Sequence, residues 1–453
     1  MNYLKVAALE AIVLAMPLVS NASELSEIER IKQEVERLRQ TYEQHIRALE
    51  ARIETLETEQ KTATPAVVEP PVVAEAPAVA AAPVPQERPN AFNPQVGVVL
   101  VGTASTYSSD RDQGIPGYMT GEEAGSPSEG FSLGESEFNM QASIDDKFYG
   151  NFTMAVADED GDTELELEEA WFQTLAMPYG LAVRGGRFFS GIGYRNQFHR
   201  HADDFVDRSL PYRVFLENQY IDDGVQLTWL APTDQFLEFG AEWLRGEGFP
   251  ASGSGNDGKG AWSLFARTGN DIGVSHSWQA GLSWLSADAD DRSSGEEDEE
   301  DHFDGDVELA IADLVWKWAP DGNPNQRNFK LEAAYFWQNQ DGIFTPHDAD
   351  GLAYDEDQTG WYVNGIYQFR PQWRAGLRIS GLDADSPGSA FDGTSLDTDG
   401  HDPRIYSAMV DWSPSEYSRL RLQYDLDESA PKTVDRLYLQ YIMSLGAHGA
   451  HRY

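Results

Sequence analysis

The sequence contains no cysteine, has few lysines and has no long apolar run beyond its N-terminal segment. Without cysteine the chain forms neither disulfides nor thiolate metal sites, which is compatible with the cell envelope. No run of about 18 apolar residues follows the N-terminal segment, so no membrane-spanning helix is predicted. The 33 lysines and arginines are outnumbered by 76 aspartates and glutamates, and the net charge is -43. This balance argues against a nucleic-acid partner, because basic side chains have to neutralise its phosphates.

Aromatic residues, in contrast, are abundant, with 12 tryptophans, 19 tyrosines and 21 phenylalanines. The run 432–453 alternates, and its apolar side carries Leu437, Leu439, Tyr441, Met443 and Leu445. The other side carries Tyr438, Gln440 and Ser444, with Ile442 as the exception. Because side chains of a strand point alternately to two faces, this run predicts a strand with one apolar face. Ending on such a strand, with Tyr453 last, is typical of bacterial outer-membrane barrels, which are apolar outside and polar inside.

Residues 1–22 have the pattern of a secretory signal peptide. Lys5 precedes an apolar stretch over 6–19, and Ser20-Asn21-Ala22 offers a small-residue cleavage site. Glu10 interrupts the apolar stretch, so an amphipathic N-terminal helix is the alternative. Export is the prediction.

Residues 24–60 contain no proline or glycine and repeat apolar residues every seven positions, as in Ile28, Val35 and Tyr42. The second seam position drifts later in the run, where Ile46 and Ile53 replace it one residue further on. This pattern predicts a short α-helical coiled coil, with a solvated single helix as the alternative. The following residues 61–89 are rich in proline, alanine and valine, cannot build a core, and predict an extended linker.

From residue 90 the pattern changes to short alternating runs separated by turns, and sixteen strands are predicted. Their ranges are 94–106, 132–144, 147–156, 164–174, 180–188, 223–230, 235–244, 261–269, 276–286, 306–318, 327–338, 360–369, 373–381, 404–412, 417–426 and 433–445. Tight turns mostly alternate with long connections, which are 107–131, 189–222, 245–260, 287–305, 339–359 and 382–403. This alternation is the layout of a closed transmembrane barrel, and a soluble sandwich or soluble barrel is the alternative.

The predicted fold class is therefore an all-β transmembrane barrel of about 16 antiparallel strands over residues 90–453, preceded by the α-helical coiled coil. An even strand count places both barrel termini, and the coiled coil with them, on the periplasmic side. Tryptophans near the predicted strand ends are expected in the interfacial girdles of the membrane. They are Trp171, Trp229, Trp243, Trp284, Trp316, Trp318, Trp373 and Trp412.

Four stretches of this region resemble the phosphate-selective porin O/P-like group, whose relatives are sometimes labelled TonB-dependent-receptor-like. They are Glu129-Gly-Phe-Ser-Leu-Gly-Glu-Ser-Glu137, Asp145-Asp-Lys-Phe-Tyr-Gly150, Leu165-Glu-Leu-Glu-Glu-Ala-Trp-Phe172 and Gly185-Gly-Arg-Phe-Phe-Ser-Gly-Ile-Gly-Tyr194. The resemblance implies an outer-membrane porin, and large porins are commonly trimers. A receptor of the TonB type has about 22 strands and a plug, whereas here the coiled coil and linker occupy the place of the plug. Phosphate porins are also rich in lysine, and residues 90–453 contain only Lys147, Lys259, Lys317, Lys330 and Lys432.

The resemblance also implies that the third external loop, 189–222, folds into the barrel and narrows the pore. Its candidate constriction residues are Arg195, His199, Arg200, His201, Asp203, Asp204, Asp207, Arg208 and Arg213. Opposed charges across a pore screen a solute by its charge and orient its dipole. An ordinary solvated external loop is the alternative. On the barrel wall, strand alternation turns a positive strip inward, formed by Arg184, Arg374, Arg378, Arg419 and Arg421.

Other motifs are weak. The acidic run Gly295-Glu-Glu-Asp-Glu-Glu-Asp301 is typical of a solvated loop, or of one bridged to lipopolysaccharide by divalent cations, rather than of a defined calcium site. His199, His201 and Asp203 are suitable ligands for zinc or iron, but their spacing is unspecific, so no metal site or cofactor is predicted. Gly130-Phe-Ser-Leu-Gly134 matches a nucleophile elbow, yet a strand pattern follows where that motif needs a helix, so no enzyme is predicted.

The predicted function is passive diffusion of small hydrophilic solutes or ions through an outer-membrane porin. Expected partners are outer-membrane lipid, lipopolysaccharide and two further copies of the chain in a homotrimer. Two alternatives stay open. One is a gated channel for a metal chelate or siderophore, and the other is a structural tether between the outer membrane and the cell wall.

Overall fold

The computed structural model describes residues 94–109, 114–121, 124–127, 129–159, 162–251, 260–295 and 300–446. The predicted signal peptide 1–22, coiled coil 24–60 and linker 61–89 lie outside these residues. Among the described residues, no helix is both long enough and apolar enough to cross a membrane.

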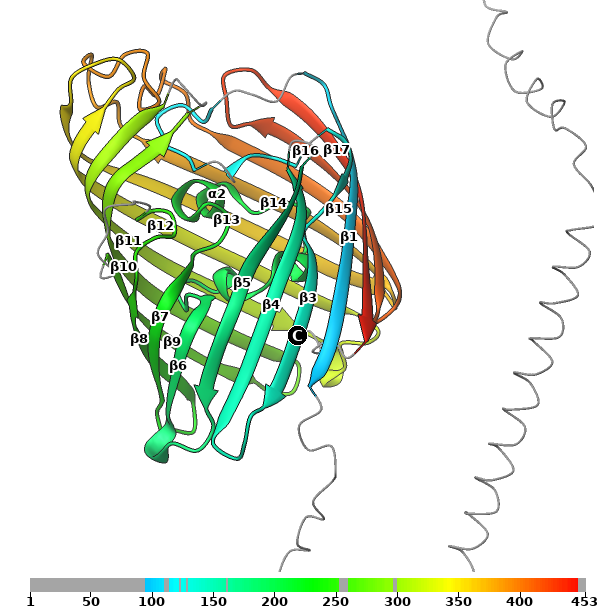
Figure 1. Cartoon of the computed structure of the whole chain (residues 1–453). Helices are drawn as coiled ribbons and strands as arrows, with labels where there is room; N and C mark the ends of the chain where they lie inside the picture. The colour runs from blue at the N-terminus through cyan, green and yellow to red at the C-terminus, as the bar shows by residue number, and fades with distance from the viewer. Residues whose placement is uncertain are drawn as a thin grey trace, which may run out of the picture. The chain divides into compact units, whose positions relative to one another are not determined.

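The described chain forms one antiparallel sheet that closes on itself (Figure 1). Its closing seam joins β1 (Gln95–Tyr107) to β17 (Val434–Gly446) over eleven residue pairs, from Gly97 opposite Gly446 to Tyr107 opposite Arg436. Seventeen strands are present, but β2 (Gly130–Leu133) and β3 (Ser136–Ser143) follow one another along the other edge of β1. They therefore occupy one position, and the barrel has sixteen, as the sequence predicts.

The other strands follow in chain order around the barrel, each paired with its neighbours. They are β4 (Phe148–Glu159), β5 (Asp162–Thr174), β6 (Leu181–Phe189), β7 (Ile221–Leu230), β8 (Phe236–Leu244), β9 (Ala261–Ile272), β10 (His276–Ser294), β11 (Asp301–Trp318), β12 (Asn328–Thr345), β13 (Leu352–Arg370), β14 (Trp373–Ala384), β15 (Arg404–Ser415) and β16 (Ser418–Glu428). The short helices are η2 (Pro178–Gly180), η3 (Arg195–Gln197), η4 (Arg200–Ala202), α2 (Leu210–Leu216) and η5 (Pro320–Gly322).

The two faces of the wall differ as the alternation predicts. In β17, Leu437, Leu439 and Met443 are between 43% and 49% exposed, whereas Tyr438 is fully buried and Gln440 is 7% exposed. The exposed side chains form the outer apolar face of the barrel, and the buried ones point into its interior. This inversion relative to a water-soluble barrel is the arrangement that a hydrocarbon surrounding requires.

Strands β10 to β13 are longer than predicted. The connections expected over 287–305 and 339–359 shrink to 295–300 and 346–351, because the two hairpins continue to pair. Their outward positions in this part are acidic rather than apolar, as at Asp306 and Asp341, so the alternating hydrophobic signal stops before the strands do. Extended hairpins therefore replace two of the six long loops.

Candidate functional site

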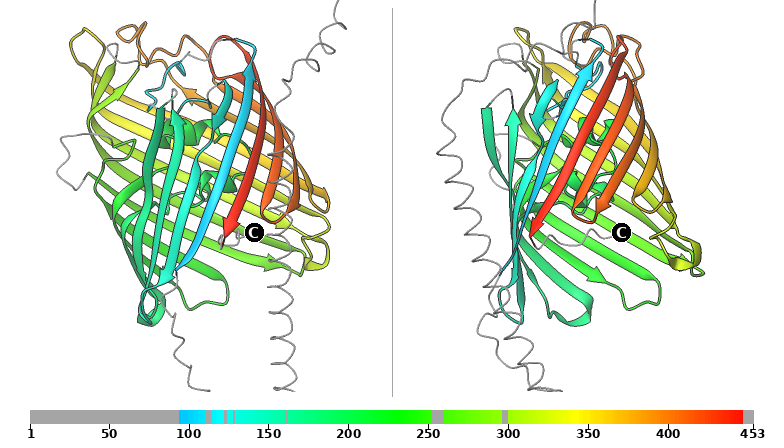
Figure 2. Two further views of the ribbon diagram at one scale, coloured as in Figure 1. Left: turned by 45° about the vertical axis from the view of Figure 1, so that its right-hand side comes forward. Right: turned by 90° about the vertical axis from the view of Figure 1, so that its right-hand side faces the viewer.

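The connection between β6 and β7, residues 190–220, lies inside the barrel, and we call it the luminal segment. It carries η3, η4 and α2, and α2 lies within the ring of strands in Figures 1 and 2. Its residues contact inward-facing side chains of β3, β5, β8, β12, β14 and β16, on different parts of the wall.

Asn196 joins the two ends of this segment, near Ser190 and Tyr220, and we call this place the neck. Its side-chain amide donates to the carbonyl oxygens of Ser190 at 2.9 Å and Tyr220 at 3.0 Å, and its Oδ1 accepts from the Tyr220 amide at 2.7 Å. The Ser190 amide also donates to the Tyr220 carbonyl at 3.1 Å. Below the neck, Glu242 of β8 accepts from the Gly191 amide at 2.7 Å and from Gln226 at 2.6 Å. The two ends of the segment are thus held together and fixed to the wall.

Helix α2 anchors the segment by apolar packing. All seven of its residues are buried, with Pro211 in its first turn, where proline costs no hydrogen bond. Tyr212 packs edge-on against Phe336 of β12 at a ring-centroid distance of 5.0 Å, and Phe215 stacks on the same ring at 6.1 Å. The helix ends at Glu217 and Asn218, both in the left-handed region, with the Asn218 amide donating to the Tyr212 carbonyl.

A charge cluster joins the middle of the luminal segment to the far wall. Arg195 forms ion pairs with Glu332 of β12 and with Asp203 at 3.2 Å. Asp204 forms ion pairs with Lys330 of β12 and with Arg374 of β14 at 2.9 Å. We call Arg195, Asp203, Asp204, Glu332, Lys330 and Arg374 the central cluster.

Burial alone would raise the pKa of Asp204, but the cations of Lys330, Arg374 and Arg195 outweigh it and hold that pKa well below its usual value. Burial likewise would lower the pKa of Arg195, and the carboxylates of Glu332, Asp203 and Asp204 instead raise it. Both groups therefore stay ionised, and the luminal segment is held by charge pairs that are shielded from water. Such pairs are costly to break one partner at a time.

The five predicted wall arginines do face inward, and four of them contact the segment. Arg374 bonds Asp204, Arg378 bonds Asp207 at 2.7 Å, and Arg419 and Arg421 donate to the Asp203 carbonyl. The fifth, Arg184, lies elsewhere, over the Trp171 ring at 4.4 Å and bonded to Gln173. The expected positive strip is therefore matched by aspartates of the segment rather than presented bare to a solute.

A second cluster joins the segment to β3 and β5. His199 Nδ1 lies 3.2 Å from Glu137 and 3.4 Å from Glu168, and His199 Nε2 lies 3.1 Å from Glu169. His201 Nδ1 contacts Glu137, and the two imidazoles stack with centroids 5.6 Å apart. Arg200 Nε lies 3.2 Å from Glu135 of the β2–β3 junction.

Burial would lower the pKa of His199, but Glu137, Glu168 and Glu169 outweigh it and raise that pKa well above the usual value. For His201 burial dominates, and with the charge of His199 beside it lowers the pKa to about 3. Burial therefore favours the neutral imidazole of His201, whose Nδ1 lies within hydrogen-bond distance of Glu137.

Two irregularities of the strands bring these glutamates inward. In β5, Glu169 pairs with Thr153 and Leu167 pairs with Met154, so Glu168 is an extra, bulged residue. As a result Glu168 and Glu169 are both buried, although neighbours in a regular strand face opposite sides. A similar extra residue lies between β2 and β3, where Leu133 pairs with Gly102 and Glu137 with Val99.

The structure thus assembles the predicted loop residues with wall residues that the sequence did not single out. Eight of the nine predicted residues form ion pairs, and Arg208, for example, pairs with Asp203. Asp207 pairs with Arg378, whereas Arg213 donates to the Ala124 carbonyl at 2.8 Å. The missed residues are Glu135, Glu137, Glu168, Glu169, Lys330, Glu332 and Asp411. An isolated carboxylate on the inner face of a predicted strand, as at Glu332 between Leu331 and Ala333, was the available signal.

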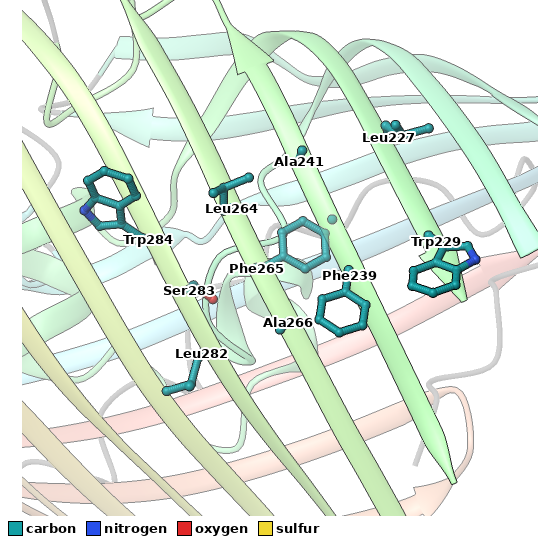
Figure 3. A pocket seen from close by; sticks show the side chains of 11 residues that line it. Leu227, Trp229, Phe239, Ala241, Leu264, Phe265, Ala266, Leu282, Ser283 and Trp284 are labelled. Atoms are coloured by element: carbon teal, nitrogen blue, oxygen red, sulfur yellow. The ribbon is translucent and has the colours of Figure 1, made fainter. Parts of the chain in front are cut away.

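Space beside the central cluster is small. A cavity of about 20 Å³ lies between Arg195, Asp207, Tyr212 and Asn364, which is room for about one water molecule. A larger depression of about 510 Å³ lies on the outer face, among Leu227, Trp229, Phe239, Leu264 and Trp284 (Figure 3). Ala241 and Ala266 leave this hollow because their small side chains stand among larger ones. It belongs to the outer apolar surface and has no polar chemistry.

The expected girdle position of Trp171 is wrong. The bulge at Glu168 shifts the phase of β5, so that the Trp171 indole lies under Arg184 and donates to Glu169 at 2.8 Å. Trp229 and Trp243, in contrast, are exposed on the outer face, at 40% and 64%.

Comparisons with known proteins leave the function open. No protein-family model matches the chain. An uncharacterized protein of Aquifex aeolicus (strain VF5) is 28% identical over 398 residues, or 80% of each chain.

Among solved structures, an anion-selective porin from Comamonas acidovorans has 10% identity and a TM-score of 0.49, covering 78% of this chain and 99% of that one. The outer membrane channel DcaP of Acinetobacter baumannii has 13% identity and a TM-score of 0.47, covering 78% and 97%. OmpT of Vibrio cholerae, an outer membrane protein, has 10% identity and a TM-score of 0.47, covering 80% and 100%. Identities and scores this low carry no argument about solute, and the resemblance to phosphate-selective porins stays a prediction.

Proposed function

We propose that this protein is an outer-membrane porin that passes small hydrophilic solutes or ions through a pore narrowed by the luminal segment. The observation that carries the proposal is the combination of an apolar outer face with an interior spanned by a charged segment. A polar interior has no use in a protein that merely sits in lipid, whereas a charged constriction sorts solutes.

The ion-paired charges at the constriction are balanced, and Arg419 and Arg421, which donate to the Asp203 carbonyl, lie beside them. Besides the central cluster, Arg208, Arg378, Asp207 and Asp411 lie in ion pairs that adjoin it. Together these groups comprise five cations and five anions, namely Arg195, Arg208, Lys330, Arg374, Arg378, Asp203, Asp204, Asp207, Glu332 and Asp411. We therefore expect weak selectivity between anions and cations, with opposed charges orienting dipolar solutes.

A gated channel is the second candidate, and the tight packing of the luminal segment favours it. A cavity of only about 20 Å³ beside the central cluster leaves little space there for a bulky chelate unless the segment moves. The homotrimer, the periplasmic coiled coil, and contact with outer-membrane lipid and lipopolysaccharide stay predictions from the sequence. So does the prediction that the protein is not an enzyme.

The test is to insert the full chain into planar lipid bilayers and to measure single-channel conductance and the reversal potential under a salt gradient. A porin gives steady conductance at low voltage and, with balanced charges, a reversal potential near zero. A folded, heat-modifiable barrel that stays silent contradicts the porin and supports the gated channel. Deleting 24–89 separates the tether, because a porin without these residues still conducts.

A further inference from the structure

We propose that Glu137, Glu168, His199 and His201 bind one divalent transition-metal ion of the zinc class, which fastens the luminal segment to β3 and β5. Among the described residues, Glu137, His199 and His201 are the one group of histidines and carboxylates whose donor atoms all lie within 4.8 Å of one another. The histidines come from η4 and the residue before it, and the glutamates come from two different strands. The site therefore exists only because the luminal segment folds inward.

The donor set suits zinc or a similar ion. Two imidazole nitrogens and two carboxylate oxygens would form a four-coordinate site. Zinc prefers such mixed nitrogen and oxygen ligands, whereas calcium and magnesium prefer oxygen ligands. In a tetrahedral site with bonds of about 2.0–2.1 Å, ligand atoms are about 3.3 Å apart. His199 Nδ1 lies 3.2 Å from Glu137 and 3.4 Å from Glu168, so these separations already match.

The outer contacts orient His199 for this role. Its Nε2 faces Glu169, which also accepts from Asn151 at 2.9 Å and from Trp171 at 2.8 Å. A carboxylate that accepts from one imidazole nitrogen leaves the other nitrogen bare, and metal-bound histidines commonly have this partner. In neutral His199 the free nitrogen is therefore Nδ1, which points at Glu137 and Glu168, and a metal ion would take the place of its proton.

The cluster also holds buried polar atoms that a metal ion would satisfy. His199 Nδ1 lies at ion-pair distance from Glu137 and Glu168, but neither this nitrogen nor either carboxylate oxygen of Glu168 forms a hydrogen bond of regular geometry. Glu168 is 1% exposed, so water does not replace those bonds. Four carboxylates gather here, those of Glu137, Glu168 and Glu169 around His199 and that of Glu135 beside Arg200, and a divalent cation offsets part of their negative charge.

A proton on His199 is the competing occupant, and metal binding distinguishes the two. The full chain, carrying an affinity tag without histidine, is purified from outer membranes, stripped with a chelator, and titrated with Zn²⁺ and with Co²⁺. We expect one ion per chain by elemental analysis and the intense visible absorption of four-coordinate Co²⁺. Binding of Ca²⁺ or Mg²⁺ alone overturns the assignment of nitrogen ligands.

Variants locate the site. His201→Ala removes a ligand and should abolish the Co²⁺ absorption, whereas Glu169→Gln disturbs only the outer contact and should weaken binding by about 10-fold to 100-fold. His347→Ala is the matched control, because His347 lies on an exposed connection beside Asp348. Heat modifiability verifies that each barrel folds, and Glu168→Gln, nearly equal in shape, provides a second ligand variant. If the stripped wild-type chain takes up no Zn²⁺ or Co²⁺, or if His201→Ala and His347→Ala bind alike, the proposal is wrong.

Discussion

The luminal segment and the extended hairpins of β10 to β13 are both rich in charge, and they use it in opposite ways. Inside the barrel, Asp204 is buried and contacts three cations, those of Arg195, Lys330 and Arg374. On the hairpins, the strand register sets Asp306 opposite both Asp288 and Asp341. Asp341 in turn lies opposite Asp355, so four aspartates form a row across four strands.

The difference shows what the surroundings demand of a charged side chain. A carboxylate shielded from water has to have a cation or several hydrogen-bond donors, because desolvation otherwise costs several kcal/mol. A carboxylate in water tolerates neighbours of the same sign, since solvent and salt screen them. The large negative charge of the chain is thus compatible with balanced ion pairs inside the barrel, and net charge is a poor guide to the charge selectivity of the proposed pore.

The substitution with the largest expected effect removes Asp204, the anion at the middle of the central cluster. Asp204→Ala removes a carboxylate that three cations share, although each of them keeps another acidic partner, and loss of one partner from a buried pair costs about 3–5 kcal/mol. We expect the luminal segment to loosen, hydrogen exchange over 195–213 to accelerate, and single-channel conductance to rise. Asp223→Ala is the control, because Asp223 pairs with Arg187 at a half-exposed site. Equal effects of the two substitutions would show that the central cluster does not hold the segment.

A second test measures the coupling energy of one ion pair between the wall and the luminal segment, that of Arg378 with Asp207. Arg378 donates to Asp207 at 2.7 Å and to the Asp207 carbonyl, and its ring neighbour is Phe205 at 4.6 Å. In a double-mutant cycle of Arg378→Ala and Asp207→Ala, we expect a coupling of about 0.5–3 kcal/mol in guanidinium unfolding of the barrel. Arg378→Ala alone should also shift the reversal potential towards cation selectivity. Strictly additive effects on stability would mean that the pair does not fasten the segment.

The neck of the segment offers a test without charge. Asn196→Ala removes three hydrogen bonds and leaves buried backbone groups of Ser190 and Tyr220 with fewer partners, at a cost of about 1–3 kcal/mol. We expect larger current fluctuations in single-channel recordings, because the two ends of the segment are less firmly joined. Asn325→Ala, on the exposed connection before β12, is the control. Recordings indistinguishable from wild type would locate the hinge of the segment elsewhere.

The sequence predicted the wall of the barrel well, because lipid imposes a period of two on every strand. All sixteen predicted strands are present, and the C-terminal strand has the predicted apolar side on its outer face. The signal is lost where the hairpins leave that surrounding, as at Asp306 and Asp341, since nothing there requires an apolar side chain.

The candidate site was only half predictable. The charged residues of the luminal segment are visible in the sequence as a dense cluster on one predicted loop. Their partners are not, because Glu332 and Asp411 are each single residues on strands far away in sequence. Glu168 is less predictable still, since the bulge that turns it inward is a property of the pairing between β4 and β5.

The smallest expected effect comes from a substitution on the extended hairpins. Asp306→Asn removes one like-charge neighbour from both Asp288 and Asp341, and opposed like charges on a sheet cost about 0.2–1 kcal/mol per pair. In thermal unfolding without denaturant and at low salt, the barrel should therefore become slightly more stable. This increase in stability should fade at higher salt, because salt screens the row of aspartates. The effect contrasts in sign with Asp204→Ala, although both substitutions remove one aspartate carboxylate. A loss of stability for Asp306→Asn would show that the row is held by bound cations, and added Ca²⁺ would then stabilise the wild type but not the variant.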